Sequence, residues 1–262
     1  MAFKTLLYEL RDGVAHITLN RPEAANALNL DMGRDLMEVA LRCDEDPAVR
    51  AVLIRANGKM FCAGGDLASF GGAGEDLSRL LKELTTYLHA GVSRFARMRA
   101  PVIAAVQGSA AGAGFSLAAA ADLILAAESA RFVVAYTAVG LSPDGSSTYF
   151  LPRLVGARRA MELMMTNRVL KAPEALAWGL VNRVVEDGKL AGEAEALART
   201  LADGPTNAFG SVKRLLLEGA ADTLETQMEN EARRIADIAR TKDAREGISA
   251  FLKKRAPRFA GS

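Results

Sequence analysis

The chain has 262 residues, of which 50% are apolar and 24% are charged, and its formal net charge at pH 7 is +2. This length and this apolar content are enough to form the core of an α/β domain. The charge is close to balance and no run of five or six basic residues occurs, which argues against a nucleic-acid-binding protein.

The first half of the sequence alternates strand-like and helix-like segments. Two alternating apolar runs, 6–10 and 14–19, are separated by Arg11-Asp12-Gly13 and predict a β-hairpin. Further along, the pattern predicts strands at 51–55, 102–106 and 123–127 and helices at about 29–43, 77–98 and 115–121. Strands that alternate with helices need crossover connections, so we expect an α/β fold with a largely parallel sheet.

The chain after Thr148 is mostly helical. Apolar residues at helical spacing cover 157–165, 173–178, 190–201, 205–217, 223–239 and 243–254, and a short strand is predicted at 181–185. No linker or low-complexity segment divides the sequence. We therefore predict an α/β body over residues 1–200 and a helical region over residues 201–262.

The segment from Pro101 to Thr148 holds the features that indicate chemistry. A Gly/Ala-rich turn, 108–114, follows a predicted strand, and its small residues let backbone N–H groups approach a ligand. Such N–H groups can stabilise a developing oxyanion. Asp144 is the single carboxylate between Arg131 and Arg153, and a carboxylate in apolar surroundings can become a useful base.

Each of these features also has a purely structural interpretation. Gly/Ala runs between a strand and a helix often serve close packing. Pro143-Asp144-Gly145 is a common turn sequence in which Asp bonds to its own backbone. His16 and His89 stand alone in the sequence, which favours structural roles for both. On these residues alone, the alternatives stay open.

Metal binding, secretion and membrane insertion are not indicated. Cys43 and Cys62 form no CxxC pair and lack the histidine spacing of a zinc site, so we expect no metal and free thiols in a reducing cytoplasm. The first 13 residues carry charges at Lys4, Glu9, Arg11 and Asp12 and lack the apolar core of a signal peptide. Polar and charged residues interrupt the apolar segment 101–127, so we expect no membrane span.

A set of short motifs covers nearly the whole chain. It consists of Ile17-Thr18-Leu19-Asn20-Arg21-Pro22 with Asn26-Ala27-Leu28, Phe61-Cys62-Ala63-Gly64-Gly65-Asp66-Leu67, Pro101 through Gly114, Leu151-Pro152-Arg153-Leu154-Val155-Gly156, Ala177-Trp178-Gly179-Leu180-Val181, and Glu246-Gly247 with Phe251 and Arg255-Ala256-Pro257-Arg258-Phe259. In this order, the motifs resemble the crotonase (enoyl-CoA hydratase/isomerase) superfamily. A Rossmann fold matches less well, because no G-x-G-x-x-G opens the first βα unit.

The resemblance implies a fold and a type of substrate. The fold would be a crotonase-like spiral of ββα units with a C-terminal helical region that forms a homotrimer or hexamer. The substrate would be an acyl-CoA thioester, and no cofactor beyond it is implied. By motif position, the backbone amides of Gly65 and Ala113 would hold the thioester oxygen. Proton removal next to a thioester creates an enolate, and donors aimed at its oxygen stabilise that charge.

The resemblance also implies where the two parts of the substrate bind. Positions that contact the CoA moiety in the family correspond here to Ala25, Ala63, Asp66 and Leu67, with Lys213 as a candidate for the CoA phosphate. Tyr136 would form part of the wall of the acyl pocket.

The two glutamates of the family's hydratases are absent, and Ser116 and Tyr136 occupy their places. Hydration needs a base for the water and an acid for the carbon, and neither a hydroxyl nor a phenol serves well near neutral pH. Several isomerases of the family, among them Δ3,Δ2-enoyl-CoA isomerases and the ring-epoxide CoA isomerase of phenylacetate breakdown, resemble the chain at Asp144. One carboxylate suffices for isomerisation, because it takes a proton at one carbon and returns it at another.

These observations predict an enoyl-CoA isomerase with Asp144 as its acid and base. One alternative keeps the fold but changes the reaction, to hydration or another crotonase-type step. Another alternative is a CoA-binding paralogue without catalytic activity, which the missing glutamates favour and Asp144 opposes.

Overall fold

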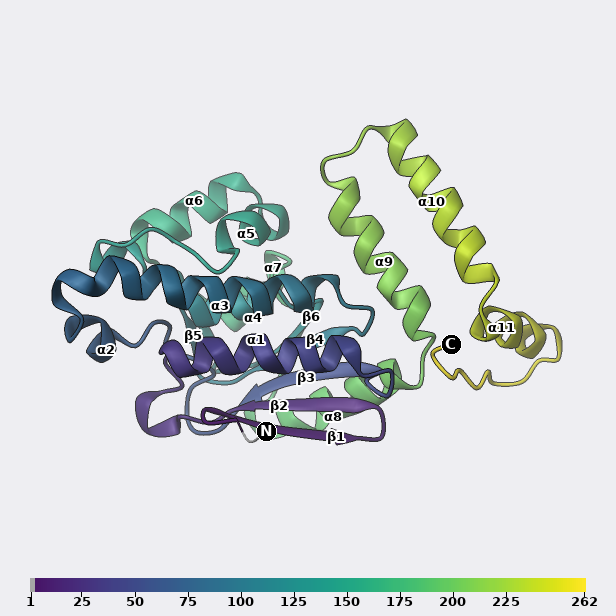
Figure 1. Cartoon of the computed structure of the whole chain (residues 1–262), viewed down its shortest axis with the longest axis horizontal. Coiled ribbons are helices and arrows are strands. Elements are labelled where there is room, and N and C mark those ends of the chain that lie inside the picture. The colour runs from purple at the N-terminus through teal and green to yellow at the C-terminus, as the bar shows by residue number, and fades with distance from the viewer. Residues whose placement is uncertain (1–2) are drawn as a thin grey trace.

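Two β-sheets form the framework of the computed structural model, which describes residues 3–262 (Figure 1). The larger sheet has the strand order β1-β2-β3-β4-β6-β9, with β1 at Leu6–Arg11, β2 at Val14–Leu19, β3 at Ala51–Ala56, β4 at Val102–Val106, β6 at Leu123–Ala127 and β9 at Arg183–Val185. Strands β1 and β2 pair antiparallel as the predicted hairpin, and the other neighbours pair parallel. The parallel pairs arise because helices connect these strands.

A smaller sheet was not predicted from the sequence. It consists of β5 (Ser109–Ala111), β7 (Arg131–Val133) and β8 (Leu170–Lys171), in that order. Strands of two or three residues are too short for an alternating pattern to stand out. This sheet begins directly after β4, so the Gly/Ala-rich turn is partly strand.

Helices cover the larger sheet. Helix α1 (Leu30–Glu45) packs along α3 (Leu77–Arg97), and α8 (Leu190–Ala202) contacts β2, β3, β4 and β6. Helix α1 begins where predicted, because the Asn29 side chain accepts a hydrogen bond from the Met32 amide at 3.0 Å. The shorter helices are α2 (Leu67–Gly71), α4 (Ala113–Ala119), α5 (Ser147–Val155), α6 (Ala157–Thr166) and α7 (Ala172–Ala177), with 3₁₀ turns η1 (Pro22–Ala24), η2 (Gly74–Asp76), η3 (Thr137–Val139) and η4 (Asp187–Lys189).

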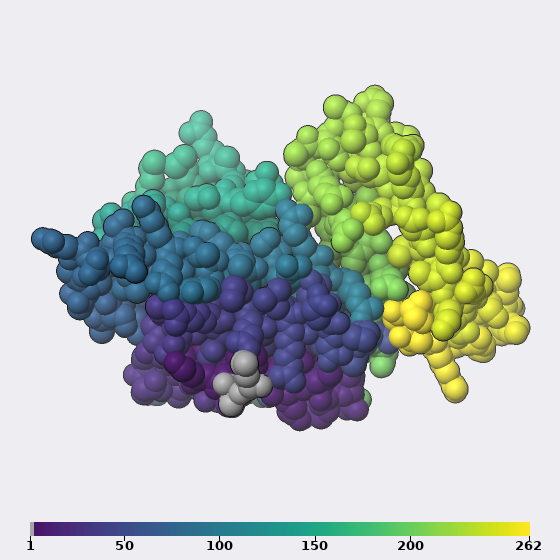
Figure 2. Space-filling view, in the orientation of Figure 1, coloured from purple at the N-terminus to yellow at the C-terminus, as the bar shows by residue number. Residues whose placement is uncertain are grey.

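The last three helices stand apart from this body. Helices α9 (Thr206–Gly219), α10 (Leu224–Ala239) and α11 (Lys242–Leu252) form the green-to-yellow region at one side of the molecule (Figures 1 and 2). Helix α8 belongs to the body through Ala202, so the chain leaves the body just after it. The domain boundary at residue 200 itself stays a prediction. Within residues 3–262, no helix is both long and apolar enough to cross a bilayer.

The topology brings the two motif-bearing turns together. Strands β3 and β4 are parallel neighbours, so their carboxyl ends lie at the same edge of the sheet. The loop that contains Phe61 to Asp66 follows β3, and the Gly/Ala-rich turn follows β4. A bridge between Cys62 and Ala110 joins the two directly.

Candidate active site

A cavity of about 350 Å³ opens at this edge of the sheet. Its walls are mostly apolar and come from α3, from the loop before α2 and α2 itself, from the start of α4, and from the segment around η3. The lining residues are Leu28, Ala63, Gly64, Gly65, Leu67, Phe70, Leu81, Leu84, Thr85, Leu88, Gly112, Ala113, Ala135, Tyr136, Ala138, Val139, Leu141, Ser142 and Asp144. Asp144 is the only carboxylate among them. Most of the residues assigned from the motifs therefore meet in one place.

The Gly65 amide is left free by the way its loop is held. The Leu28 amide donates to the Gly64 carbonyl at 2.7 Å, and the Asp66 amide donates to the Leu28 carbonyl at 2.9 Å. In this parallel bridge, the N–H of Gly65 points away from Leu28. Among residues 3–262 it has no hydrogen-bond partner, and Gly65 lines the cavity. A Cβ at Gly65 would lie 2.5 Å from the Phe70 ring, so a larger residue there would displace that ring from the cavity wall.

The Ala113 amide is free for a different reason. Ala113 is the first residue of α4, where an N–H has no partner within the helix. The preceding Gly112 has φ 49° and ψ −125°, which favours glycine, and its amide donates to the Val133 carbonyl at 3.0 Å. No hydrogen bond of the Ala113 amide occurs within the described part of the chain, and Ala113 also lines the cavity.

Close packing holds the two turns against each other. The Ala111 amide donates to the Cys62 carbonyl at 2.9 Å, and the Cys62 amide donates to the Ser109 carbonyl at 3.1 Å. A Cβ at Gly114 would lie only 2.5 Å from Cβ of Cys62, so the absence of a side chain allows the turns to touch. The packing role and the free amides thus coexist in the same turns.

The Asp144 side chain does not bond to its own turn. Its Oδ1 accepts a hydrogen bond from the Tyr136 hydroxyl, and its Oδ2 lies 3.8 Å from Nε2 of His89. The Asp144 backbone carbonyl instead holds the turn, because it accepts from the amide and the hydroxyl of Ser147 at 3.1 and 2.9 Å. The side chain is 26% exposed and lines the cavity.

Tyr136 has a more specific place than the wall position expected from the sequence. It lines the cavity, and its hydroxyl lies between the Asp144 carboxylate and the Ser116 hydroxyl, 3.1 Å from the latter. Burial, followed by the negative charge of Asp144, raises the pKa of Tyr136 well above its ordinary value. The phenol therefore stays protonated and acts as a hydrogen-bond donor.

His89 was assigned a structural role from the sequence, yet it lies beside Asp144. Its Nε2 accepts a hydrogen bond from the Gly145 amide at 3.2 Å. Because this nitrogen is an acceptor, its 3.8 Å approach to Oδ2 of Asp144 is not a hydrogen bond. Only the tertiary contact between α3 and the Asp144 turn reveals this neighbour, since no motif links the two residues.

The residues assigned to CoA binding separate into two groups. Ala63 and Leu67 line the cavity, whereas Ala25 and Asp66 do not. The Ala25 carbonyl accepts from the Ala63 amide at 3.0 Å, so Ala25 supports that loop from outside.

Asp66 forms an ion pair of 3.0 Å with Arg21 and caps α2 by accepting from the Ser69 amide at 3.1 Å. Burial opposes its ionisation, but Ser69 and Arg21 outweigh that effect and hold the pKa of Asp66 below its usual value.

Lys213, the candidate for the CoA phosphate, directs its charge into the protein, and its phosphate role stays a prediction. Its side chain is 8% exposed and forms an ion pair of 2.7 Å with Asp122. It also donates to the carbonyls of Phe95 and Ala100 at 2.9 and 3.0 Å. A lysine has three N–H donors, so all are used inside the protein. Burial lowers the pKa of Lys213 and raises the pKa of Asp122, which indicates a buried structural pair.

No cluster of three or more His, Cys, Asp or Glu side chains suited to a metal ion occurs within residues 3–262. Both cysteines are buried, and burial raises the pKa of Cys43 and of Cys62 to about 12 in each case. The chemistry available at the cavity is therefore that of two free amides, one carboxylate and the groups that contact it.

Comparison with known proteins identifies the family. The family model described as enoyl-CoA hydratase/isomerase matches residues 9–262. The chain is 40% identical over 262 residues to the 1,2-epoxyphenylacetyl-CoA isomerase of Escherichia coli (strain K12), covering 98% of each chain. It is 40% identical over 261 residues, the whole of both chains, to a protein of Rhodobacter capsulatus named "Probable enoyl-CoA hydratase".

A solved structure supports the same conclusion. The crystal structure of an enoyl-CoA hydratase from Polaromonas sp. JS666 has a TM-score of 0.93 at 34% identity, covering 97% of this chain and 99% of that one. The predicted crotonase-like α/β fold is thus confirmed, and the chain belongs to the enoyl-CoA hydratase/isomerase family.

Proposed function

We propose that this member of the family is an isomerase, which moves a C=C bond, or rearranges a ring, in an enoyl-CoA thioester. The observation that carries the proposal is the orientation of Asp144. Its carboxylate bonds to no backbone group of its own turn and lines a cavity that also contains the free amides of Gly65 and Ala113. A residue that only formed the turn would use its side chain locally.

The proposed reaction uses these groups in two steps. Asp144 takes a proton from a carbon of the acyl group, and the electron pair of that C–H bond moves toward the thioester oxygen. The Gly65 and Ala113 amides then donate hydrogen bonds to the resulting enolate oxygen. Asp144 returns the proton to a different carbon, so the carboxylate ends the cycle unchanged.

The absence of a second carboxylate in the cavity lining supports isomerisation over hydration. Adding water needs one group to activate the water and another to protonate the carbon. Ser116 and Tyr136 stand where the hydratases have glutamates. The raised pKa of Tyr136 keeps the phenol protonated near neutral pH, so the phenolate that could act as a base is scarce. The relative named as an isomerase adds support, whereas the relative named as a hydratase keeps hydration as the alternative.

Two substrates separate the possibilities. The protein is incubated with a 3-enoyl-CoA and, separately, with a 2-enoyl-CoA, and the absorbance of the conjugated thioester is followed. Isomerisation makes this band appear from the 3-enoyl ester. Loss of the band from the 2-enoyl ester, with no gain from the 3-enoyl ester, would establish hydration instead. No change with either ester would exclude a shift of the C=C bond and leave ring rearrangement and a CoA-binding paralogue, which a ring-epoxide CoA ester then separates.

The proposed substrate sits with its acyl group in the cavity and its CoA moiety across the loop that contains Ala63 and Leu67. Ala25 and Asp66 shape this loop from behind. No further cofactor takes part, because the CoA thioester itself provides the electron sink for the proton transfer.

We also propose that the chain assembles as a homotrimer or hexamer through α9, α10 and α11. These helices expose large apolar side chains to an unusual extent, including Leu216 at 74% and Phe251 at 83%. Such side chains are normally covered when they cluster. Light scattering at micromolar concentration is expected to give three or six times the mass of the chain. A monomer would contradict this proposal.

A further inference from the structure

The Tyr136 hydroxyl connects α4 to the carboxylate proposed to carry the proton. On one side it contacts the Ser116 hydroxyl, and on the other it donates to Oδ1 of Asp144. We propose that Tyr136 is a positioning residue, a role that rests on the isomerase function proposed above. Its hydroxyl fixes Oδ1 and leaves Oδ2 as the oxygen that takes and returns the substrate proton.

Counting protons shows why the Tyr136 hydroxyl must be the donor. A carboxylate can only accept, so the single proton of the phenol is used on Asp144. Ser116 also has one hydroxyl proton, and three acceptors lie within reach: Tyr136 at 3.1 Å, the Asp144 carbonyl at 3.0 Å and the Gly112 carbonyl at 3.2 Å. Ser116 thus supports the phenol less strongly than the phenol supports Asp144.

Oδ2 is left without a hydrogen-bond donor among residues 3–262. The groups that face the carboxylate are Tyr136, from the segment before η3, and His89, from α3. His89 uses Nε2 to accept the Gly145 amide, so this nitrogen does not donate to Oδ2. The two oxygens of Asp144 therefore differ: Oδ1 is bonded, and Oδ2 is available.

The backbone is shaped to hold both partners. Ala135, directly before Tyr136, has φ 62°, and Ser146, two residues after Asp144, has φ 75°. Left-handed conformations of residues other than glycine are unfavourable and persist where surrounding contacts impose them. A left-handed residue directly before the donor and another two residues after the acceptor indicate that surrounding contacts impose this arrangement.

The proton balance of the step is simple. A substrate C–H bond breaks and an O–H bond forms at Oδ2, while the C–H electron pair becomes part of the enolate. The O–H bond then breaks as a C–H bond forms at the second carbon. Oδ1 keeps the Tyr136 hydrogen bond throughout, which prevents the carboxylate from rotating between the two transfers.

Tyr136→Phe tests this role with a readout that a purely structural residue would not change. Loss of a donor to the charged carboxylate favours its protonated form, so the acid limb of the pH–rate profile should move to higher pH. We expect kcat to fall roughly 10- to 100-fold, the effect of one hydrogen bond to a charged group. KM should change little. Ser116→Ala should shift the profile in the same direction by less.

Tyr149→Phe is the matched control. Its hydroxyl contacts the Leu217 carbonyl at 3.4 Å, outside the cavity, so its removal should leave both kcat and the pH profile unchanged. If the wild type isomerises and Tyr136→Phe keeps the wild-type kcat and acid limb, the positioning role is wrong while the proposed function stands.

A second measurement does not depend on turnover or on the folding of Tyr136→Phe. The chain has four tyrosines, so ring-¹³C labelling at Cζ gives a small set of NMR signals, and Tyr→Phe variants at the other three positions assign the Tyr136 signal by elimination. In ligand-free Asp144→Asn, the Tyr136 signal should move more than those of the other three. An unmoved Tyr136 signal would overturn the inference, whatever the activity proves to be.

Discussion

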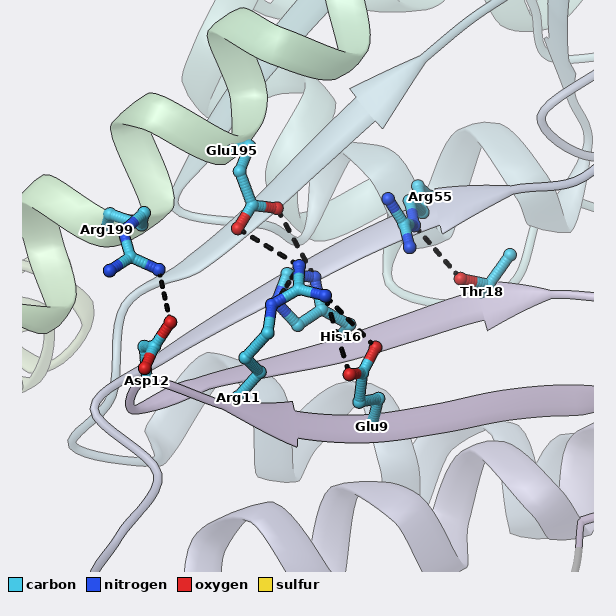
Figure 3. A network of polar contacts seen from close by, with 8 residues as sticks. All are labelled: Glu9, Arg11, Asp12, His16, Thr18, Arg55, Glu195 and Arg199. Carbon is cyan, nitrogen blue, oxygen red and sulfur yellow. Dashed lines mark hydrogen bonds and ion pairs between the residues drawn. The ribbon is translucent and has the colours of Figure 1, made fainter.

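Two regions of the molecule differ in whether their polar groups have partners within the protein. Between the β1–β2 hairpin and α8, charged side chains pair with one another, as Figure 3 shows: Arg199 contacts Asp12 at 2.6 Å, and Arg11 contacts Glu195 at 3.4 Å. In the cavity, by contrast, two amides and one carboxylate oxygen have no partner among residues 3–262.

The difference separates polar groups that are paired within the protein from groups that are free to meet a substrate. Exposed ion pairs such as those of the hairpin contribute little to stability, on the order of 0–1 kcal/mol each. Unpaired polar atoms inside an apolar cavity are costly unless a ligand satisfies them. The comparison therefore assigns the chemistry to the cavity and a supporting role to the hairpin network.

The largest expected effect comes from Asp144→Asn. The change keeps the size of the side chain but removes the base, so isomerisation should slow by roughly 10²- to 10⁴-fold. Steady-state kinetics measures this, and binding of the CoA ester should persist. Asp12→Asn is the matched control, since Asp12 precedes a glycine in a turn as Asp144 does, and it should have wild-type activity. Equal activity of the two variants would return Asp144 to a turn role.

Removal of one free amide should have the next largest effect. Ala113→Pro deletes the N–H at the first position of α4, where proline is well tolerated. The rate should fall on the order of a hundredfold, as for the loss of one oxyanion donor. Ala157→Pro makes the same change at the first position of α6, also after a glycine, and should leave the reaction rate unchanged. A folded Ala113→Pro variant with normal turnover would remove Ala113 from the site.

Lys213→Met tests a polar group that is paired within the protein, as the charges of the hairpin network are, rather than free in the cavity. Breaking this buried pair leaves Asp122 without its counter-charge and should cost roughly 3 kcal/mol in the free energy of unfolding. KM for the CoA ester should stay unchanged at a temperature where the variant is folded. Lys189→Met, at an exposed pair with Glu186, is the control, and its free energy of unfolding should equal that of the wild type. A raised KM without loss of stability would support the phosphate role.

The smallest effect concerns His16, which is 2% exposed and lies 3.6 Å from Glu195. Arg11 can only donate to its Nε2, so the neutral ring carries its proton on Nδ1. Burial lowers the pKa of His16, so the unfolded chain binds this proton more readily than the folded one.

The sign of the pH dependence follows from that lowered pKa. Well above pH 6.5, the usual pKa of His, the free energy of unfolding should not depend on His16. It should fall as the pH drops below 6.5 toward the lower pKa of His16 in the folded state. Thermal unfolding of the wild type and of His16→Gln, measured between pH 7 and pH 5, should show a shallower decline for the variant. Parallel curves would contradict this account of the hairpin network.

The sequence predicted those parts of the fold that depend on local pattern. The hairpin, β3, β4 and β6 have clear apolar runs, and the motifs located Gly65, Ala113 and Asp144, which line one cavity. The three-stranded sheet was missed because its strands are too short to show a period. The interaction of His89 with the Asp144 turn and the burial of Lys213 against Asp122 were missed because both depend on contacts between distant segments.

The central claim is that Asp144 moves a proton between two carbons of the acyl group. Single-turnover isomerisation in D₂O, with deuterium followed at the α and γ carbons by NMR, tests it most directly. We predict label at these carbons with the wild type and neither label nor product on the same timescale with Asp144→Asn. Wild-type rates of product formation and labelling by Asp144→Asn would contradict the account.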